Sequence, residues 1–306
     1  MATSTSSCLA EKTSTLENHP PVPPSQATAA QVPLKDFNLP TFPPEAFSAG
    51  LTSLILTSDI KMDDQLFGGT TPESRQDATT FLDNLKGLKE VHFLDVFTPQ
   101  TVMQGFAQAI SEDVGFVEVS YTYRHSDPEF LKTLPKCELG GFVREGMKAL
   151  RLAMQSPDVS ERDEEDREGT EEGILTLPRG GDTGRLLERV REAGAALVLL
   201  DLTLFEIQVD DLLAILDSCR ELKVLAVSIS LDEGWDKLVE QLQGKLGGVE
   251  SLEMVGVPGA KMVDGLKEGK ADGCLNEKLC GLLGEGVRGV SVSILRTQGG
   301  SWGRGE

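Results

Sequence analysis

Basic residues are scarce in this sequence. Its 29 lysines and arginines stand against 49 aspartates and glutamates, so the formal net charge is −20. Phosphate backbones and anionic bilayers are bound through Lys and Arg, and a chain with this balance repels both. Nucleic acids and membrane surfaces are therefore excluded as first candidates for a partner.

Long apolar runs and clustered cysteines are also missing. The longest run, "AGAALVLLDLTLF", contains Asp201 and is much shorter than the roughly 20 residues that cross a bilayer. The N-terminus, "MATSTSSCLAEKTS", has no basic start before an apolar stretch, so it does not resemble a secretory signal. The five cysteines lack the close pairing of small disulfide-framed domains. We expect a reducing compartment, either cytoplasmic or nuclear.

Groups suited to proton transfer are few, since the chain has only three histidines. His19 precedes the apolar phrases, and His125 lies where a strand is expected to enter a turn. His92 lies in the strand-like phrase "EVHFLDVF", where alternation points it away from Asp95. The sequence contains neither G-x-S-x-G nor G-x-x-x-x-G-K-[ST], the motifs of a nucleophile elbow and a phosphate loop. No catalytic residue and no cofactor site are predicted.

The cysteines do not indicate a metal site. Cys274 and Cys280 stand in "CLNEKLC", but zinc needs about four ligands and no further His or Cys lies nearby. Cys219 lies on an expected helix, where a small buried residue is the ordinary interpretation.

Composition divides the chain into three parts. Residues 1–45 are rich in Ser, Thr, Ala and Pro without apolar periodicity, which predicts a disordered segment. Residues 46–296 carry the apolar phrases and form the expected folded domain, and residues 297–306 are expected to be a flexible tail. Within the domain, residues 157–173 hold nine acids and two arginines, which is typical of a solvated loop.

One six-residue phrase recurs, with apolar residues at its first, fourth and sixth positions. Nine copies begin at residues 51, 88, 114, 147, 172, 197, 222, 249 and 287, and five of the eight intervals are 25 to 27 residues. Segments with helical spacing of apolar residues separate most copies, for example "QVDDLLAILDSCRE". A strand–turn–helix unit repeated at such a period indicates a solenoid. The copy at 172 is imperfect, and it is alternatively one half of a hairpin with the copy at 147.

The segment "LVLLDLTLFEIQVDDLLAILDSCRELKVLAVSIS" resembles the longer, helix-containing leucine-rich repeats of ribonuclease-inhibitor-like and F-box-associated proteins, including many fungal chains. The resemblance implies an α/β solenoid, with parallel strands on one face and helices on the other. The turn position of such repeats usually holds Asn or Cys, but here it holds Asp59, Val96, Phe205, Ser230 and Val257. We therefore expect an irregular leucine-rich-repeat-like stack; the alternative is a globular α/β sheet with helices on one face.

Strand alternation points the fifth residue of each phrase away from the core. Five of these residues are charged or titratable and form the candidate protein-binding face: His92, Glu118, Arg151, Asp201 and Glu253. The complete row adds Ile55, Thr176, Ala226 and Ser291.

The row has no aromatic series and no basic track, so it suits selective contact with a folded protein or peptide. We expect a non-catalytic, intracellular protein-interaction module, and the resemblance implies substrate recognition for an F-box-type ubiquitin ligase as the sharper form. The alternative is a hydrolase that uses Asp, Glu or Cys in a cleft of the sheet. An enzyme predicts a deep pocket with clustered, pKa-perturbed groups, whereas a binding face predicts a shallow surface with solvated charges.

Overall fold

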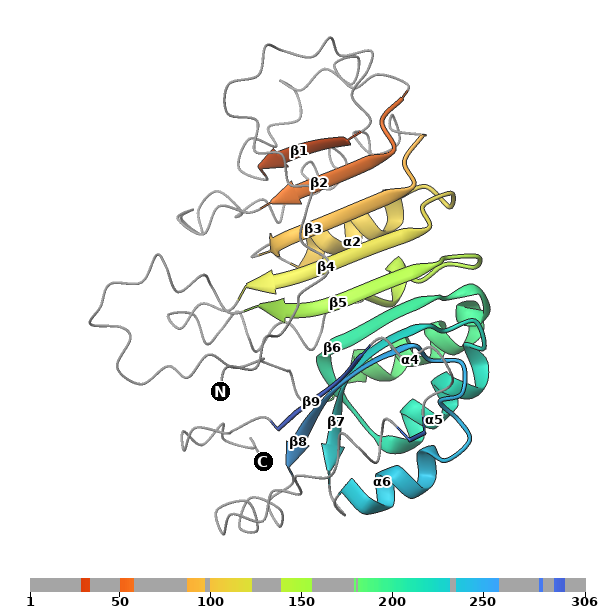
Figure 1. Ribbon diagram of the computed structural model, residues 1–306. Helices are drawn as coiled ribbons and strands as arrows, with labels where there is room; N and C mark the ends of the chain where they lie inside the picture. The colour runs from red at the N-terminus through yellow and green to blue at the C-terminus, as the bar shows by residue number, and fades with distance from the viewer. Residues whose placement is uncertain are drawn as a thin grey trace, which may run out of the picture.

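The chain folds as an α/β protein around one parallel sheet (Figure 1). The computed structural model describes residues 29–33, 50–57, 87–96, 100–122, 139–155, 179, 181–231, 235–258, 281–282 and 289–294. The nine strands in these ranges are β1 (Ala29–Pro33), β2 (Ser53–Thr57), β3 (Glu90–Val96), β4 (Phe116–Thr122), β5 (Ala149–Gln155), β6 (Leu199–Ile207), β7 (Val224–Leu231), β8 (Ser251–Pro258) and β9 (Gly289–Ile294).

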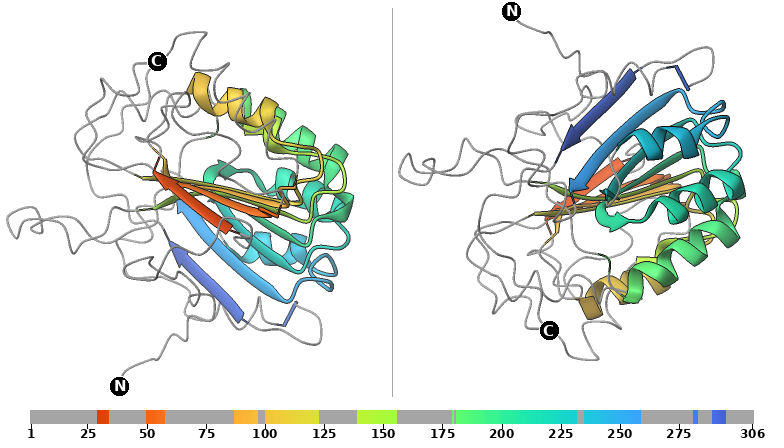
Figure 2. Two further views of the ribbon diagram at one scale, coloured as in Figure 1. Left: turned by 90° about the horizontal axis from the view of Figure 1, so that it is seen from above. Right: turned by 90° about the horizontal axis from the view of Figure 1, so that it is seen from below.

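Strand order follows chain order from β1 to β9, and every pairing is parallel. The sheet is open, because β1 and β9 each pair on one side only within the described residues. It twists along its length, so that β8 and β9 run at an angle to β2–β5 (Figure 2).

The helices form a second layer on one face of the sheet (Figures 1 and 2). They are α2 (Gln100–Ala109), α4 (Gly181–Ala193), α5 (Val209–Ser218) and α6 (Trp235–Leu242), with 3₁₀ turns η6 (Leu139–Phe142) and η9 (Gly194–Ala196). Neighbours along the chain touch, from α2 through η6 to α4, α5 and α6. A single helical layer is expected, because parallel crossovers share one hand and the strands advance in one direction.

The local sequence explains these elements. In β7, Leu225, Val227, Ile229 and Leu231 alternate along the strand and are buried on the side of the helices, and Ala226 and Ser228 on the other side are buried as well. Helix α5 starts with a capping box, in which Gln208 and Asp211 satisfy each other's backbone N–H groups. Its buried side chains, Leu212, Ile215 and Leu216, repeat with helical spacing and pack toward the sheet.

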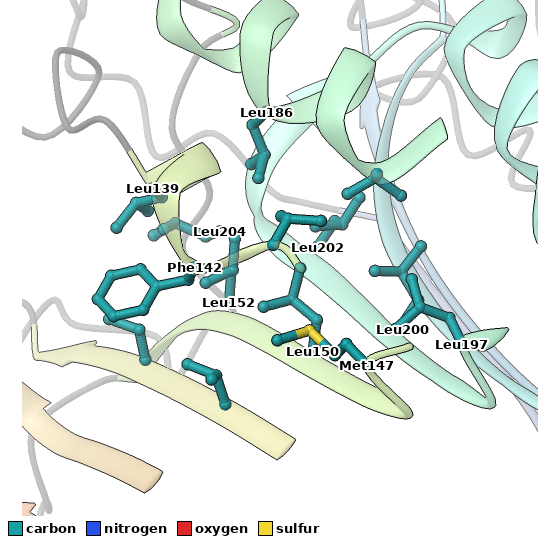
Figure 3. Packing of buried hydrophobic residues seen from close by; sticks show 14 of the residues in the cluster. Leu139, Phe142, Met147, Leu150, Leu152, Leu186, Leu197, Leu200, Leu202 and Leu204 are labelled. Atoms are coloured by element: carbon teal, nitrogen blue, oxygen red, sulfur yellow. The ribbon is translucent and has the colours of Figure 1, made fainter. Parts of the chain in front are cut away.

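The core lies between the two layers, as Figure 3 shows for β5, β6, η6 and α4. Strand residues that are fully or almost fully buried stand opposite one another in register, as do Val117, Leu150 and Leu200. Burial of each such side chain contributes roughly 1.5–3 kcal/mol. The continuous row of buried residues therefore fixes the strand register, since a slip of one residue would turn the apolar set outward.

One hydrogen-bond arrangement recurs where the strands begin. The carbonyl oxygen of the residue before one strand accepts from two successive N–H groups at the start of the next strand. The acceptors are Thr52, Lys89, Gly115, Lys148, Val198 and Lys223, with N···O distances of 2.8–3.1 Å. Each unit therefore enters the sheet in the same way.

Eight of the nine repeat phrases coincide with strands, from β2 at the phrase beginning at 51 to β9 at the phrase beginning at 287. The copy at 172 lies outside the described residues. β5 pairs directly with β6 at Ala149–Arg151, so that copy adds no strand between them there. Strand β1 falls within residues 1–45, where the sequence shows no periodicity. The acidic segment 157–173 and the tail 297–306 are also outside the described part of the chain.

The positions where leucine-rich repeats turn are strand positions in this chain. Val96, Phe205, Ser230 and Val257 lie within β3, β6, β7 and β8. An Asn that satisfies turn backbone is not needed there, because these strands run on past the six-residue phrase. Asp59 lies outside the described residues. None of the helices in the described ranges is long and apolar enough to cross a membrane.

Candidate functional site

A row of side chains crosses the face of the sheet opposite the helices. The strand register aligns Ile55, His92, Glu118, Arg151, Asp201, Ala226, Glu253 and Ser291 on eight adjacent strands. This is the row expected from alternation, apart from Thr176, which lies outside the described residues. All five candidate binding residues therefore lie on one line.

Four of these residues form a continuous hydrogen-bonded network. His92 Nδ1 lies 2.7 Å from Glu118 Oε2, and Arg151 Nη1 lies 3.2 Å from Glu118 Oε1. Arg151 Nε donates to Asp201 Oδ2 at 3.0 Å, so one guanidinium group bridges two carboxylates. Asp201 Oδ1 accepts from both the backbone N–H and the hydroxyl of Thr203. Each of the four carboxylate oxygens has a partner.

The network is only partly solvated. The side chains of Glu118 and Asp201 are 11% and 10% exposed, whereas that of Arg151 is 45% exposed. The expectation of solvated charges is therefore wrong for these two carboxylates. They tolerate burial because hydrogen bonds and the neighbouring cation offset the loss of hydration.

The pKa values follow from these contacts. Burial raises the pKa of Glu118, but the His92 hydrogen bond and the charge of Arg151 outweigh it, so the net shift is downward. Burial likewise lowers the pKa of Arg151, and the carboxylates of Asp201 and Glu118 reverse the effect. The lowered pKa of Glu118 favours its carboxylate form, which accepts a hydrogen bond from the Nδ1–H group of His92.

Glu253 differs from the other carboxylates of the row. It forms no ion pair within the described residues, and its side chain is exposed. Its pKa is raised, first because its carboxyl group is partly desolvated and then because Asp201 repels its charge; Arg151 opposes the shift. Among the described carboxylates of the row, Glu253 thus lacks an ion pair, and the charge of Arg151 offsets its own only in part.

Three strands carry a hydroxyl side chain two residues beyond the row: Ser120 on β4, Thr203 on β6 and Ser228 on β7. Ser228 donates to the Thr203 carbonyl at 2.9 Å across β6 and β7. Ser120, on β4, is 1% exposed, and its hydroxyl has no hydrogen-bond partner among the described residues. Sequence reasoning missed these hydroxyl groups, although the phrases "VEVSYT", "LDLTLF" and "LAVSIS" each carry one two residues after the position of the row.

The described residues do not assemble a catalytic triad around His92. Its Nε2 atom lies 3.8 Å from Glu90 Oε2, toward the start of the strand, whereas Ser120 lies toward the end. Phe116 packs edge-on against the imidazole with ring centroids 4.8 Å apart, which holds that orientation. A hydroxyl without a base is not activated as a nucleophile. This arrangement suits structural pairing better than proton transfer.

The thiol of Cys219 is buried, and burial raises its pKa to about 11. A thiol in this state is unreactive at neutral pH. In the ranges that the structure covers, no group of three or more His, Cys, Asp or Glu residues is placed to hold a metal ion. Cys274, Cys280, His19 and His125 lie outside those ranges.

Comparison with known proteins adds no relative: no protein-family model matches the sequence, and no curated protein matches it.

Proposed function

We propose that this chain is a non-catalytic protein-interaction module with the architecture of an irregular leucine-rich-repeat-like solenoid. The single observation that carries the proposal is the row of eight aligned residues on the face without helices. A partner that lies across the strands would meet positions spaced roughly 4.8 Å apart, of which Arg151 and Glu253 are exposed and Glu118, Asp201 and Ala226 are buried.

The solenoid interpretation rests on repetition at two levels. The apolar phrase recurs in the sequence. At successive strand starts, the equivalent backbone carbonyl group accepts hydrogen bonds from two N–H groups of the next strand. The strands follow chain order in the sheet, and the helices touch one another in the same order. Each unit therefore contacts mainly its neighbours. Such stacks present extended surfaces for binding.

The chemistry of the face favours recognition over catalysis. The carboxylates of Glu118 and Asp201 have partners on every oxygen, so neither is free to act as a base. A network of this kind fixes side chains before a partner arrives, which lowers the entropy cost of binding. Charged groups in fixed positions also penalise a mismatched partner.

The test compares two variants with equal changes of charge. Glu90→Lys with Glu253→Lys alters two exposed positions on the open face; it removes the 3.8 Å contact of Glu90 with His92 but none of the hydrogen bonds of the network. Glu188→Lys with Glu240→Lys makes the same change on the outer surfaces of α4 and α6. Native chain and both variants are expressed in cells as proximity-labelling fusions, and labelled proteins are identified by mass spectrometry.

We expect a small set of partners that is lost from the sheet-face variant and kept by the helix-face variant, with both variants folded by circular dichroism. A partner set that survives in both variants contradicts the proposal. A role in substrate recognition for a ubiquitin ligase stays a prediction, and a ligase adaptor among the labelled proteins would support it.

A further inference from the structure

A strip of apolar side chains lies on the open face beside the charged row. Its four members stand in register on β4 to β7, two residues before the row: Phe116, Ala149, Leu199 and Val224. They share the face of the row, because side chains two residues apart on a strand point the same way. The contact between the Phe116 ring and the His92 imidazole agrees with this placement. The strip extends over three strand spacings, roughly 14 Å.

The strip is separate from the hydrophobic core. All four side chains are half-buried, and none of them belongs to the described core cluster or packs against it. The start of β6 adds Val198, which is 37% exposed and directly precedes Leu199. Single apolar residues are ordinary on a protein surface, but contiguous apolar surface on adjacent strands is typical of a contact site.

The exposed charges at the centre of the strip are basic. Lys148 and Arg151 lie before and after Ala149 on β5, and Lys148 is exposed without an ion pair among the described residues. The Arg151 side chain is 45% exposed, and its bonds to Asp201 and Glu118 use Nε and Nη1, which leaves Nη2 for another acceptor. Those two carboxylates are buried and have partners on both oxygens. Along the strip and the row, β4, β5 and β6 therefore expose only basic charge.

We propose that this strip binds an extended segment of a partner protein in which apolar side chains alternate with acidic ones. The apolar side chains lie on Phe116, Leu199 and Val224, and a carboxylate faces Lys148 and Arg151. The inference rests on the proposed function and deepens it by naming the chemistry of the partner. Charge complementarity selects an acidic segment, because a basic one would bring like charges together over β5. At roughly 3.3 Å per residue, about five extended residues cover the strip.

Exposed acids set the limits of the site. Glu90 on β3 and Glu253 on β8 flank the four strands, and Glu112 and Glu145 lie in the turns that join the helical layer to β4 and β5. The acidic groups of the partner therefore lie over β5 rather than along the whole face. The net charge of −20 repels such a segment at long range, but salt screens that repulsion beyond about 8 Å, so contact depends on the local charges.

The experiment uses the full chain, labelled with ¹⁵N, and the synthetic peptide acetyl-LELDLEL-amide as the probe. In two comparison peptides, acetyl-LKLKLKL-amide keeps the apolar residues and acetyl-GEGDGEG-amide keeps the acids. Amide shifts are followed at Phe116, Ala149, Leu199 and Val224. We expect saturable shifts at these residues with the probe, and binding weaker by roughly tenfold with either comparison peptide, because each removes one of the two kinds of contact.

Two variants test the charge and the apolar surface separately, and circular dichroism checks that both fold. Lys148→Glu should weaken binding of the probe roughly tenfold, because it turns an attraction into a repulsion. Lys237→Glu makes the same change on the exposed surface of α6 and should leave binding unchanged. Leu199→Ser should weaken binding about fivefold, because it removes apolar contact area.

Equal binding of the lysine peptide, absent or scattered shifts, or equal effects of Lys148→Glu and Lys237→Glu overturn the inference. A dimer in sedimentation that dissociates in Lys148→Glu also overturns it, since that result assigns the strip to a second copy of the chain. In the proximity-labelling experiment, partners that are lost from Glu90→Lys with Glu253→Lys but kept by Lys148→Glu overturn the inference, while the proposed function stands. If no partners depend on the face at all, the proposed function itself has failed.

Discussion

Arg151 is the only cation of the described charged row that binds two carboxylates, so its removal should cost stability in a pH-dependent manner. Breaking a buried pair costs about 3–5 kcal/mol, and an exposed pair contributes less than about 1 kcal/mol. The carboxylates here are about nine-tenths buried and the Arg151 side chain is 45% exposed. For Arg151→Gln we therefore expect a loss of about 2 kcal/mol at neutral pH, or about 4 °C in Tm.

The pH dependence follows from the direction of the Glu118 shift. The folded-state pKa of Glu118 is lowered, so its contribution is complete above the unfolded value and is lost as pH falls through the folded value. Without the charge of Arg151, burial raises the pKa of Glu118. As pH falls, Glu118 therefore becomes protonated at a higher pH in the variant than in the native chain. The native chain should therefore exceed the variant in free energy of unfolding by the full amount at about pH 7. This difference should shrink at or below about pH 4, near the ordinary glutamate pKa.

The assay is urea unfolding across this pH range. Arg220→Gln is the matched control, because Arg220 is exposed and has no ion pair within the described residues. Both substitutions remove one positive charge. The reasoning is refuted if both variants lose the same stability at neutral pH, or if the deficit of Arg151→Gln does not shrink on acidification.

Three further predictions concern buried groups. Ser228→Ala should cost about 1 kcal/mol, because Ser228 donates to Thr203, whereas Ser120→Ala should be neutral or stabilising, because its hydroxyl is unbonded; equal losses in chemical denaturation would contradict this. Gly194→Ala should destabilise by about 1–3 kcal/mol, since the new Cβ would lie 2.7 Å from Cys219 Sγ and 3.1 Å from Leu197 Cδ1. A double-mutant cycle with Cys219→Ala should recover part of that loss, and strict additivity would exclude the clash as its cause. With a pKa of about 11, Cys219 should resist iodoacetamide at pH 8 in the native state and react after unfolding, which peptide mapping by mass spectrometry measures; rapid native labelling would show that the thiol is accessible.

The sequence predicted more of the fold than of the site. Positions that face the core require apolar side chains, and these recur in the six-residue phrase. The strands and the outward row could therefore be predicted from local alternation. Helix α5 followed from apolar residues with helical spacing in "QVDDLLAILDSCRE". Strand length was not readable, because β6–β8 continue through positions where the resemblance implied turns. Strand propensity depends on the neighbouring strands, so the sequence alone does not show where the pairing ends.

The sequence by itself determined which residues stand in the row, since a period of two assigns each side chain to one face whatever lies beside it. Only the tertiary structure decided which of them meet. His92 and Glu118 are 26 residues apart in sequence, and Arg151 and Asp201 are 50 residues apart, so their contacts depend on strand order and register. The same lateral packing lowers the pKa of Glu118, leaves Glu253 without an ion pair among the described residues and leaves the Ser120 hydroxyl unbonded. Hydrogen bonds and charge balance act over a few ångströms, and that separation is set by the neighbouring strand rather than by the local sequence.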